Sequence, residues 1–200
     1  MLNEYFTLLV DCIQTEGGML DKFIGDAIMA AFGLPTPAAD DEDRGVRTAI
    51  SMIRAMNEWN VGRVAQEKPP IDMGIGLNTD TVVAGNIGSP KRMDFTVIGD
   101  GVNLAARLES AGKQYKARIL ISDLTLSRLN GVYRTREVDH VVVKAKTEPV
   151  AIHGVLDYHT EQTFPNLMDV VNHFRDGITG YRQGEWARSI GSFQQALPPT

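Results

Sequence analysis

The sequence predicts an α+β fold of the sandwich type, with one main domain and a helical extension. Its 200 residues and 22.0 kDa suit a single domain of ordinary size with an appendage. A hydrophobic content of 43% is enough to build a core. Segments with strand-like patterns alternate along the chain with segments of helical spacing, which is typical of an α/β or α+β sandwich.

The first third of the chain predicts a helix, a hairpin and a second helix. Apolar residues at helical spacing predict a helix from residue 2 to about 14, which Gly17 and Gly18 end. Two apolar runs predict a hairpin with strands at 19–24 and 27–33. A second helix is predicted over 43–60, capped by Asp40 or Asp41, and a polar connector follows it to residue 70.

The middle of the chain predicts the rest of the main domain. We expect strands at 71–77, 81–87, 92–98, 118–122, 134–143 and 150–156, and helices at 102–111 and 123–129. Asp100 is the expected cap of the helix over 102–111, and Gly112 its expected end. The main domain then spans 1–157, and 158–200 forms a linker and helical tail.

The tail has two interpretations. Its apolar and small residues over 167–196 have spacings similar to one tetratricopeptide repeat. A single repeat cannot bury its own face, so that interpretation expects the array to continue after Thr200. The alternative is a terminal helix pair that folds back on the domain.

Composition narrows the class of protein. The net charge of −5 and a pI of about 5.4 give no electrostatic reason to expect nucleic-acid binding. A single cysteine, Cys12, excludes an intrachain disulfide and fits a reducing, cytoplasmic location. No apolar run reaches the roughly 20 residues of a membrane span.

Charged residues stand in the predicted hairpin. Its apolar flanks predict that it is well buried, yet Lys22 and Asp26 lie four residues apart around its turn. Burying an ammonium and a carboxylate is costly without a partner, and a carboxylate beside a tight turn suits Mg²⁺. The alternative is a solvated aspartate in an ordinary Gly-Asp turn.

Two further segments offer groups that could bind phosphate. Asn103 and Arg107 share one face near the start of a predicted helix, where the helix end favours anions and arginine can bind phosphate in a bidentate manner. Lys144 and Lys146 follow a predicted strand and could contact phosphate. Exposed or ion-paired side chains without function are the alternative for both segments.

Taken together, these motifs resemble the class III nucleotidyl cyclases over roughly residues 1–157. The residues that carry the resemblance are Lys22-Phe23-Ile24-Gly25-Asp26, Gly74 to Thr79 with Gly85 to Ser89, and Asp94 to Glu109. The chain most resembles the bacterial and cyanobacterial adenylyl cyclases, a group similar to the soluble, bicarbonate-responsive cyclases. The resemblance implies the ferredoxin-like cyclase fold.

The resemblance also implies residue roles. Lys22 and Thr96 match the pair that selects the purine: the ammonium faces a ring nitrogen of adenine, and the threonine oxygen accepts from the exocyclic amine. Asp26 matches one of two aspartates that hold a pair of Mg²⁺ or Mn²⁺ ions. Asn103 and Arg107 match the residues that stabilise the transition state. Lys144 matches a lysine for the terminal phosphates, although Ala145 replaces the family's usual glycine.

The implied reaction converts ATP to 3′,5′-cyclic AMP and pyrophosphate, through attack of the ribose 3′-hydroxyl on the α-phosphorus. The resemblance implies a head-to-tail homodimer in which Asp26 serves one site and Lys22, Thr96, Asn103 and Arg107 serve the other. It also implies that the second metal aspartate and a phosphate-binding turn lie on a strand before residue 2. We therefore expect the 200-residue chain alone to bind nucleotide weakly and to fold poorly unless it dimerises.

Two alternatives stay open at this point. Guanylyl cyclases usually carry Glu and Cys, or another small residue, at the positions of Lys22 and Thr96, so the pair argues for ATP without excluding GTP. The domain could instead be a non-catalytic, cyclase-like module for dimerisation or sensing. One local departure is Asp80, where relatives commonly have a glycine that often supplies a positive φ.

Overall fold

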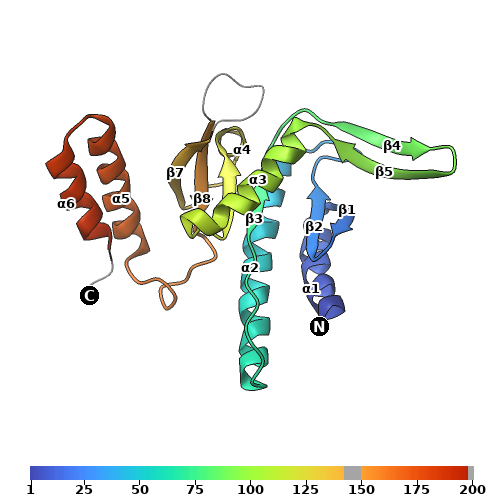
Figure 1. Cartoon of the computed structure of the whole chain (residues 1–200), viewed down its shortest axis with the longest axis horizontal. Coiled ribbons are helices and arrows are strands. Elements are labelled where there is room, and N and C mark those ends of the chain that lie inside the picture. Colours follow the sequence, from blue (N-terminus) through green and yellow to red (C-terminus); the bar gives the residue numbers. More distant parts are fainter. Residues whose placement is uncertain (142–149, 198–200) are drawn as a thin grey trace.

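The computed structural model of the chain describes residues 1–141 and 150–197 (Figure 1). The elements follow the predicted order. The helices are α1 (Leu2–Thr15), α2 (Asp41–Ala65), α3 (Asp100–Tyr115), α4 (Asp123–Ser127), α5 (Leu167–Arg182) and α6 (Trp186–Ala196). The strands are β1 (Met19–Ile24), β2 (Ala27–Ala31), β3 (Ile75–Leu77), β4 (Val83–Ser89), β5 (Arg92–Ile98), β6 (Ile119–Ser122), β7 (Thr135–Val141) and β8 (Val150–Val155).

A four-stranded sheet with the order β3-β6-β8-β7 forms the centre of the main domain. β3 runs parallel to β6, and the other neighbours are antiparallel. Ile119 and Ile121 of β6 pack against α2, while Leu120 packs against α3. All three side chains are fully buried, because helices cover both faces of the sheet. The fold is therefore the predicted α+β sandwich.

The β1–β2 hairpin lies beside α1 and α2 and outside the central sheet (Figure 1). Leu9 and Ile13 of α1 pack with Met52 and Met56 of α2 in a second core. Leu20 of β1 contacts the same core. Helix α2 therefore joins the hairpin to the sheet, because it packs on both.

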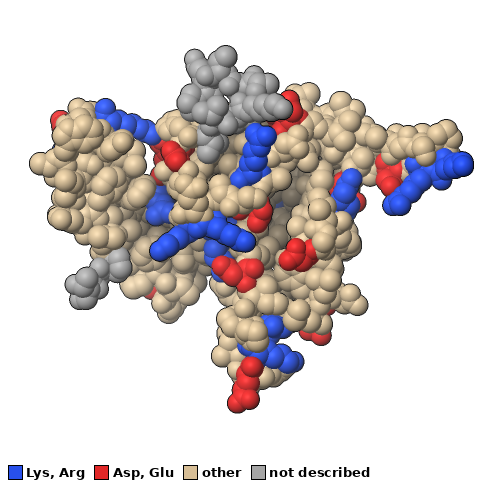
Figure 2. Space-filling model, in the orientation of Figure 1, with Lys and Arg blue, Asp and Glu red and all other residues tan. Residues whose placement is uncertain are grey.

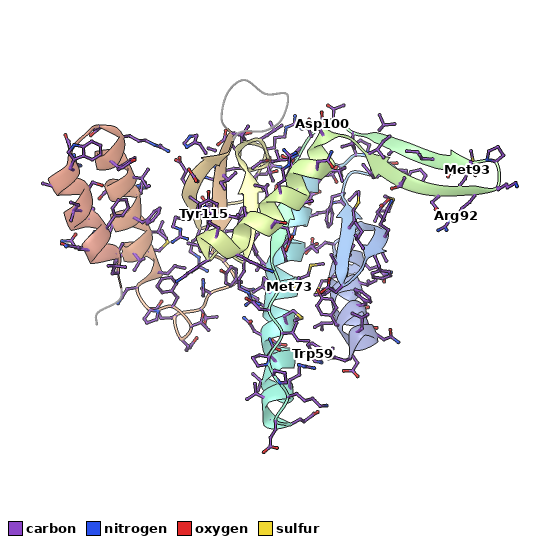
Figure 3. The ribbon with its side chains drawn as sticks, viewed as in Figure 1. Trp59, Met73, Arg92, Met93, Asp100 and Tyr115 are labelled. Atoms are coloured by element: carbon purple, nitrogen blue, oxygen red, sulfur yellow. The ribbon has the colours of Figure 1, made fainter. Side chains whose placement is uncertain are left out.

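Strands β4 and β5 form a long two-stranded arm that projects away from the sheet (Figure 1). Arg92 and Met93 lie at its far end, and Asp100, at the start of α3, lies at its base (Figure 3). Basic side chains gather at the tip of the arm (Figure 2). The arm also exposes apolar side chains, among them Met93 at 61% and Phe95 at 45%. Such exposure marks a candidate interaction surface.

The tail forms a helical pair, α5 and α6, as both interpretations of the sequence expected. Phe193 of α6 packs against Gly177 of α5, at which a Cβ atom would lie 2.6 Å from the ring. The pair also contacts the main domain, since Arg182 pairs with Glu137 of β7 and the Arg136 guanidinium stacks on Phe174 at 4.8 Å. The contact does not decide between the two interpretations of the tail, which both stay predictions.

Several predicted boundaries were wrong. Helix α2 continues to Ala65, into the segment predicted as a connector, and β3 begins at Ile75 instead of residue 71. Helix α3 starts at Asp100, with Gly99 in the cap position, and passes through Gly112 to Tyr115. Gly112 is buried inside the helix. A Cβ atom there would lie 2.6 Å from the Ala117 carbonyl oxygen, so the position has no room for a side chain. That glycine serves close packing and does not end the helix.

No helix among the described residues is both long and apolar enough to cross a membrane.

Candidate functional site

The turn of the β1–β2 hairpin contains two residues, Gly25 and Asp26, between the paired residues Ile24 and Ala27. Gly25 has a φ of +65°, which the missing side chain permits at no steric cost. The predicted burial of this hairpin was wrong at its tip: Phe23 is 46% exposed and Ile24 58%. Helix α1 reaches the tip, where the Phe6 ring centroid lies 4.3 Å from that of Phe23, but it leaves about half of each tip side chain exposed. The carboxylate of Asp26 is therefore at an exposed turn, where it costs little.

A β-bulge interrupts the hairpin beside Lys22. Leu20 pairs with Ala30 and Lys22 pairs with Met29, so Asp21 has no residue opposite it. A bulge residue departs from the alternation of side chains along a strand and can point toward a neighbouring element. The Asp21 side chain is completely buried. Strand β1 contacts β5 here, which brings Asp21 to Thr96.

Lys22 and Thr96 meet at one oxygen of Asp21. The Thr96 hydroxyl donates a hydrogen bond to Asp21 Oδ2 over 3.0 Å, and Lys22 Nζ lies 3.4 Å from the same oxygen. Thr96 is buried at 7% exposure, whereas the Lys22 side chain is 45% exposed. The structure thus brings together two residues that are 74 positions apart in the sequence. They form a small polar site with one buried and one accessible side.

The prediction from sequence missed Asp21. Alternation along a regular strand places Asp21 and Lys22 on opposite faces, so a regular strand would not bring both side chains to one site. A usable signal existed, because an aspartate in an apolar strand needs a partner if it is buried.

Asn103 and Arg107 lie on the exposed side of α3, one helical turn apart. Among the described residues neither is seen to make a side-chain hydrogen bond, and no ion pair joins Arg107 to a glutamate. Their exposure fits both a role in ligand binding and the alternative of exposed side chains without function, so the roles of Asn103 and Arg107 stay predictions. Neither side chain would have to break a hydrogen bond to a described residue in order to contact a ligand.

Two glycines fix the position of α3. At Gly76 of β3 a Cβ atom would lie 2.1 Å from the Ala105 carbonyl oxygen, and at Gly101 it would lie 2.4 Å from Asp80. The Asn78 side chain donates to the Gly101 carbonyl oxygen over 3.1 Å. Asp80 has no positive φ, and its carboxylate accepts a hydrogen bond from the Thr81 N–H over 2.8 Å.

Asp26 is a single candidate ligand for a metal ion. Among the described residues, no group of three or more His, Cys, Asp or Glu side chains could hold a metal. A carboxylate at an accessible turn fits Mg²⁺ in donor type, because this ion is often bound by one or two carboxylates together with substrate phosphates. Burial raises the pKa of Tyr5, and the charges of Asp26 and Glu109 raise it further. The hairpin turn therefore lies close enough to α1 to influence it.

Lys144, the candidate for the terminal phosphates, falls outside the described residues, as do its neighbours from 142 to 149.

Comparison with known proteins places this geometry in a family. Residues 1–159 match the family model described as "Adenylate and Guanylate cyclase catalytic domain". An adenylate cyclase of Anabaena cylindrica is 39% identical over 163 residues, which cover 77% of this chain and 31% of that protein. The chain spans less than a third of the length of the first curated relatives that it matches.

Solved structures agree with this match. The adenylyl cyclase CyaB of P. aeruginosa superposes with a TM-score of 0.71 at 34% identity, covering 82% of this chain and 83% of that one. The guanylyl cyclase Cya2 gives a TM-score of 0.67 at 39% identity and covers 77% of both chains. Both nucleotide specificities occur among these neighbours, so similarity alone does not select ATP or GTP. The chain belongs to the family of adenylate and guanylate cyclase catalytic domains.

Proposed function

We propose that this domain is an adenylyl cyclase, which converts ATP to 3′,5′-cyclic AMP and pyrophosphate. The observation that carries the proposal is the meeting of Lys22 and Thr96 at Asp21. An ammonium donates to the ring nitrogen N1 of adenine, and a threonine oxygen accepts from the exocyclic amine. Guanine carries a donor at N1 and an acceptor at O6, so it matches this pair poorly.

The reaction forms one bond and breaks another. The ribose 3′-oxygen bonds to the α-phosphorus, the bond from that phosphorus to the bridging oxygen breaks, and pyrophosphate leaves. The proton of the 3′-hydroxyl passes to solvent or to a nearby base. The residues mainly orient the ribose and stabilise the charge that develops.

Asn103 and Arg107 are the proposed groups for that charge. Their exposure on one face of α3 leaves an amide and a guanidinium free to contact the ribose and the phosphates. The guanidinium can bind two phosphate oxygens at once. Lys144 is proposed for the terminal phosphates on the basis of the family resemblance alone.

Asp26 is the proposed ligand for a divalent cation, Mg²⁺ or Mn²⁺, together with the phosphates of ATP. When bound, such a cation supplies positive charge for the phosphates and lowers the pKa of a bound hydroxyl. The protein's part is to hold one carboxylate at the accessible hairpin turn.

We also propose that two copies assemble head to tail. The exposed apolar side chains of the β4–β5 arm and of the hairpin tip support this, because a soluble domain gains by covering them. A dimer also explains how Lys22 and Asp26 can belong to one hairpin, since each would serve a different site.

The experiment that tests the function is product analysis with the full-length protein. ATP and GTP are supplied separately with Mg²⁺ or Mn²⁺, and the cyclic nucleotides are measured by chromatography. We expect cyclic AMP from ATP and much less cyclic GMP from GTP. A clear preference for GTP would make the protein a guanylyl cyclase, and no product from either would favour a non-catalytic module.

A further inference from the structure

The buried carboxylate of Asp21 lies between the two residues that we assign to the base. Its side chain has no exposed surface, and Oδ2 interacts with both Thr96 and Lys22. The other oxygen, Oδ1, is buried and has no hydrogen-bond partner among the described residues. A buried carboxylate is costly unless its position is useful or its charge is compensated. Lys22 offers only partial compensation because it is itself half-exposed.

The hydrogen bond from Thr96 limits what this threonine can do toward a ligand. A hydroxyl has one hydrogen to donate and two lone pairs to accept with, and a carboxylate can only accept. Because the Thr96 hydrogen is directed at Asp21 Oδ2, the Thr96 oxygen has only lone pairs left for a base. Without Asp21 the hydroxyl could rotate and serve either as donor or as acceptor.

We propose that Asp21 is a positioning residue that determines nucleotide specificity, by fixing Thr96 as an acceptor and drawing Lys22 to the same edge. This inference rests on the proposed function of the site. Adenine presents an amino donor where guanine presents the O6 acceptor. A Thr96 oxygen that can only accept therefore binds adenine and rejects guanine. Lys22 alone would not exclude guanine, because an ammonium can also donate to the O6 acceptor beside N1.

The bulge explains how Asp21 reaches this position. In a regular strand Asp21 would have a cross-strand partner and would face away from Lys22. The register shift between Leu20 and Lys22 removes that partner, and the side chain turns to β5. Bulges commonly re-aim a side chain beside a functional site in this way.

The variant Asp21→Asn tests the inference with almost no change in volume. An asparagine amide can donate to the Thr96 oxygen, so the threonine hydroxyl becomes free to donate to O6 of guanine. We expect the preference for ATP over GTP, measured as the ratio of the two kcat/KM values, to fall by about tenfold or more. Loss of ATP turnover and gain of GTP turnover both contribute to that ratio.

Two controls separate positioning from folding. Asp94→Asn makes the same chemical change at an exposed site on β5, where the side chain pairs with Arg92, and should leave the ratio unchanged. In a Thr96→Val background the hydroxyl is gone, so adding Asp21→Asn should change the ratio much less than it does in the wild type, through its effect on Lys22 alone. Such a double-mutant cycle reports the coupling between the two side chains. Thermal unfolding of each full-length variant monitors the fold.

Nucleotide binding provides a second readout that does not need turnover. Competition of ATP and of GTP against a fluorescent ATP analogue gives the ratio of their dissociation constants. We expect Asp21→Asn to reduce the preference for ATP in binding as in turnover. If the variant loses both nucleotides equally, Asp21 has only a structural role and the inference is wrong. It is equally wrong if the ratio does not change.

The outcomes also separate this inference from the proposed function. Formation of cyclic AMP by the wild-type protein, with an unchanged ratio in Asp21→Asn, overturns the role of Asp21 alone. Absence of any cyclic product from the wild type overturns the proposed activity, and the binding ratio then still decides on Asp21. A wild-type protein without preference for ATP in either measurement overturns the inference.

Discussion

Two exposed side chains on α3, Asn103 and Arg107, make no side-chain hydrogen bond or ion pair with a described residue. Their contribution to catalysis can therefore be tested by substitutions that have no large effect on stability. We predict that Asn103→Ala or Arg107→Ala lowers kcat by about 10²–10³ and changes KM much less, since they contact charge that develops in the transition state. Steady-state kinetics with ATP on the full-length protein measure both constants.

Lys113→Ala provides the control for these variants, because Lys113 is exposed on the last turn of the same helix. It should leave kcat unchanged. A rise in KM with constant kcat in the Asn103 and Arg107 variants would show that the two residues bind the ground state and the transition state equally.

Asp43 is a second buried carboxylate, and both of its oxygens accept hydrogen bonds. It is 3% exposed and accepts from the Asn130 and Gly131 N–H groups and the Tyr133 hydroxyl, at 2.8–2.9 Å. Burial acts to raise the pKa of Asp43, but these hydrogen bonds outweigh it and the pKa is lowered. Burial and the Asp43 carboxylate together raise the pKa of Tyr133 to about 12.

The lowered pKa predicts how stability depends on pH. A carboxyl whose folded pKa lies below its unfolded value stabilises the protein above the unfolded value, about 3.9, and loses this effect as pH falls through the folded pKa. We expect Asp43→Asn to lower the free energy of unfolding by about 2 kcal/mol at pH 7, and the difference from wild type to shrink below pH 4. Urea titrations at several pH values measure this difference. The exposed Asp176→Asn is the control, and a difference independent of pH would contradict the prediction.

At the scale of elements, the contact of α3 with β3 depends on a glycine. No side chain fits at Gly76, where backbone atoms of Ala105 and Glu109 lie 2.1 and 2.4 Å from a Cβ position. We predict that Gly76→Ala pushes α3 away from the sheet and costs about 1–3 kcal/mol of stability, as overpacking does. Because α3 carries Asn103 and Arg107, activity should fall by more than the folded fraction does.

Gly62 offers a matched control for that substitution. It lies in α2, and a Cβ atom there would meet nothing within 4 Å. Gly62→Ala should stabilise the protein by about 0.5–1 kcal/mol, because alanine favours the helix. Thermal unfolding of both variants gives the comparison, and equal effects of the two substitutions would refute the packing argument.

At the scale of the whole molecule, the proposed head-to-tail dimer makes an unusual prediction. Asp26→Asn and Asn103→Ala should each be nearly inactive alone. When the two full-length variants are mixed and exchange subunits, each mixed dimer has one site in which both residues are intact. We expect the activity to recover to about a quarter of that of wild type, because half of the dimers are mixed and half of their sites are restored.

A measurement of cyclic AMP before and after mixing checks this expectation, with sedimentation to confirm dimers. Mixing Asn103→Ala with Arg107→Ala is the control: both variants damage the same half of the site, so no intact site forms. Recovery in the control, or its absence in the first mixture, would contradict a site shared between chains.

The sequence by itself determined the α+β class and most elements. The run Ile119-Leu120-Ile121 predicted a strand, and the structure buries it on both faces between α2 and α3. Periodicity reports which residues share a face, and that information is local. The family resemblance gave Lys22, Asp26, Thr96, Asn103, Arg107 and Lys144 as candidates, and their roles stay predictions.

Only the tertiary structure decided which side chains meet. The predicted burial of the hairpin failed at its tip, since local hydrophobicity does not tell whether another layer covers a strand. Gly112 was expected to end a helix, but the approach of Ala117 explains it instead. The contact of Asp21 with Thr96 depends on a bulge and on the packing of β1 against β5, across 75 positions of sequence. Such a contact follows from packing between distant segments, which no local pattern specifies.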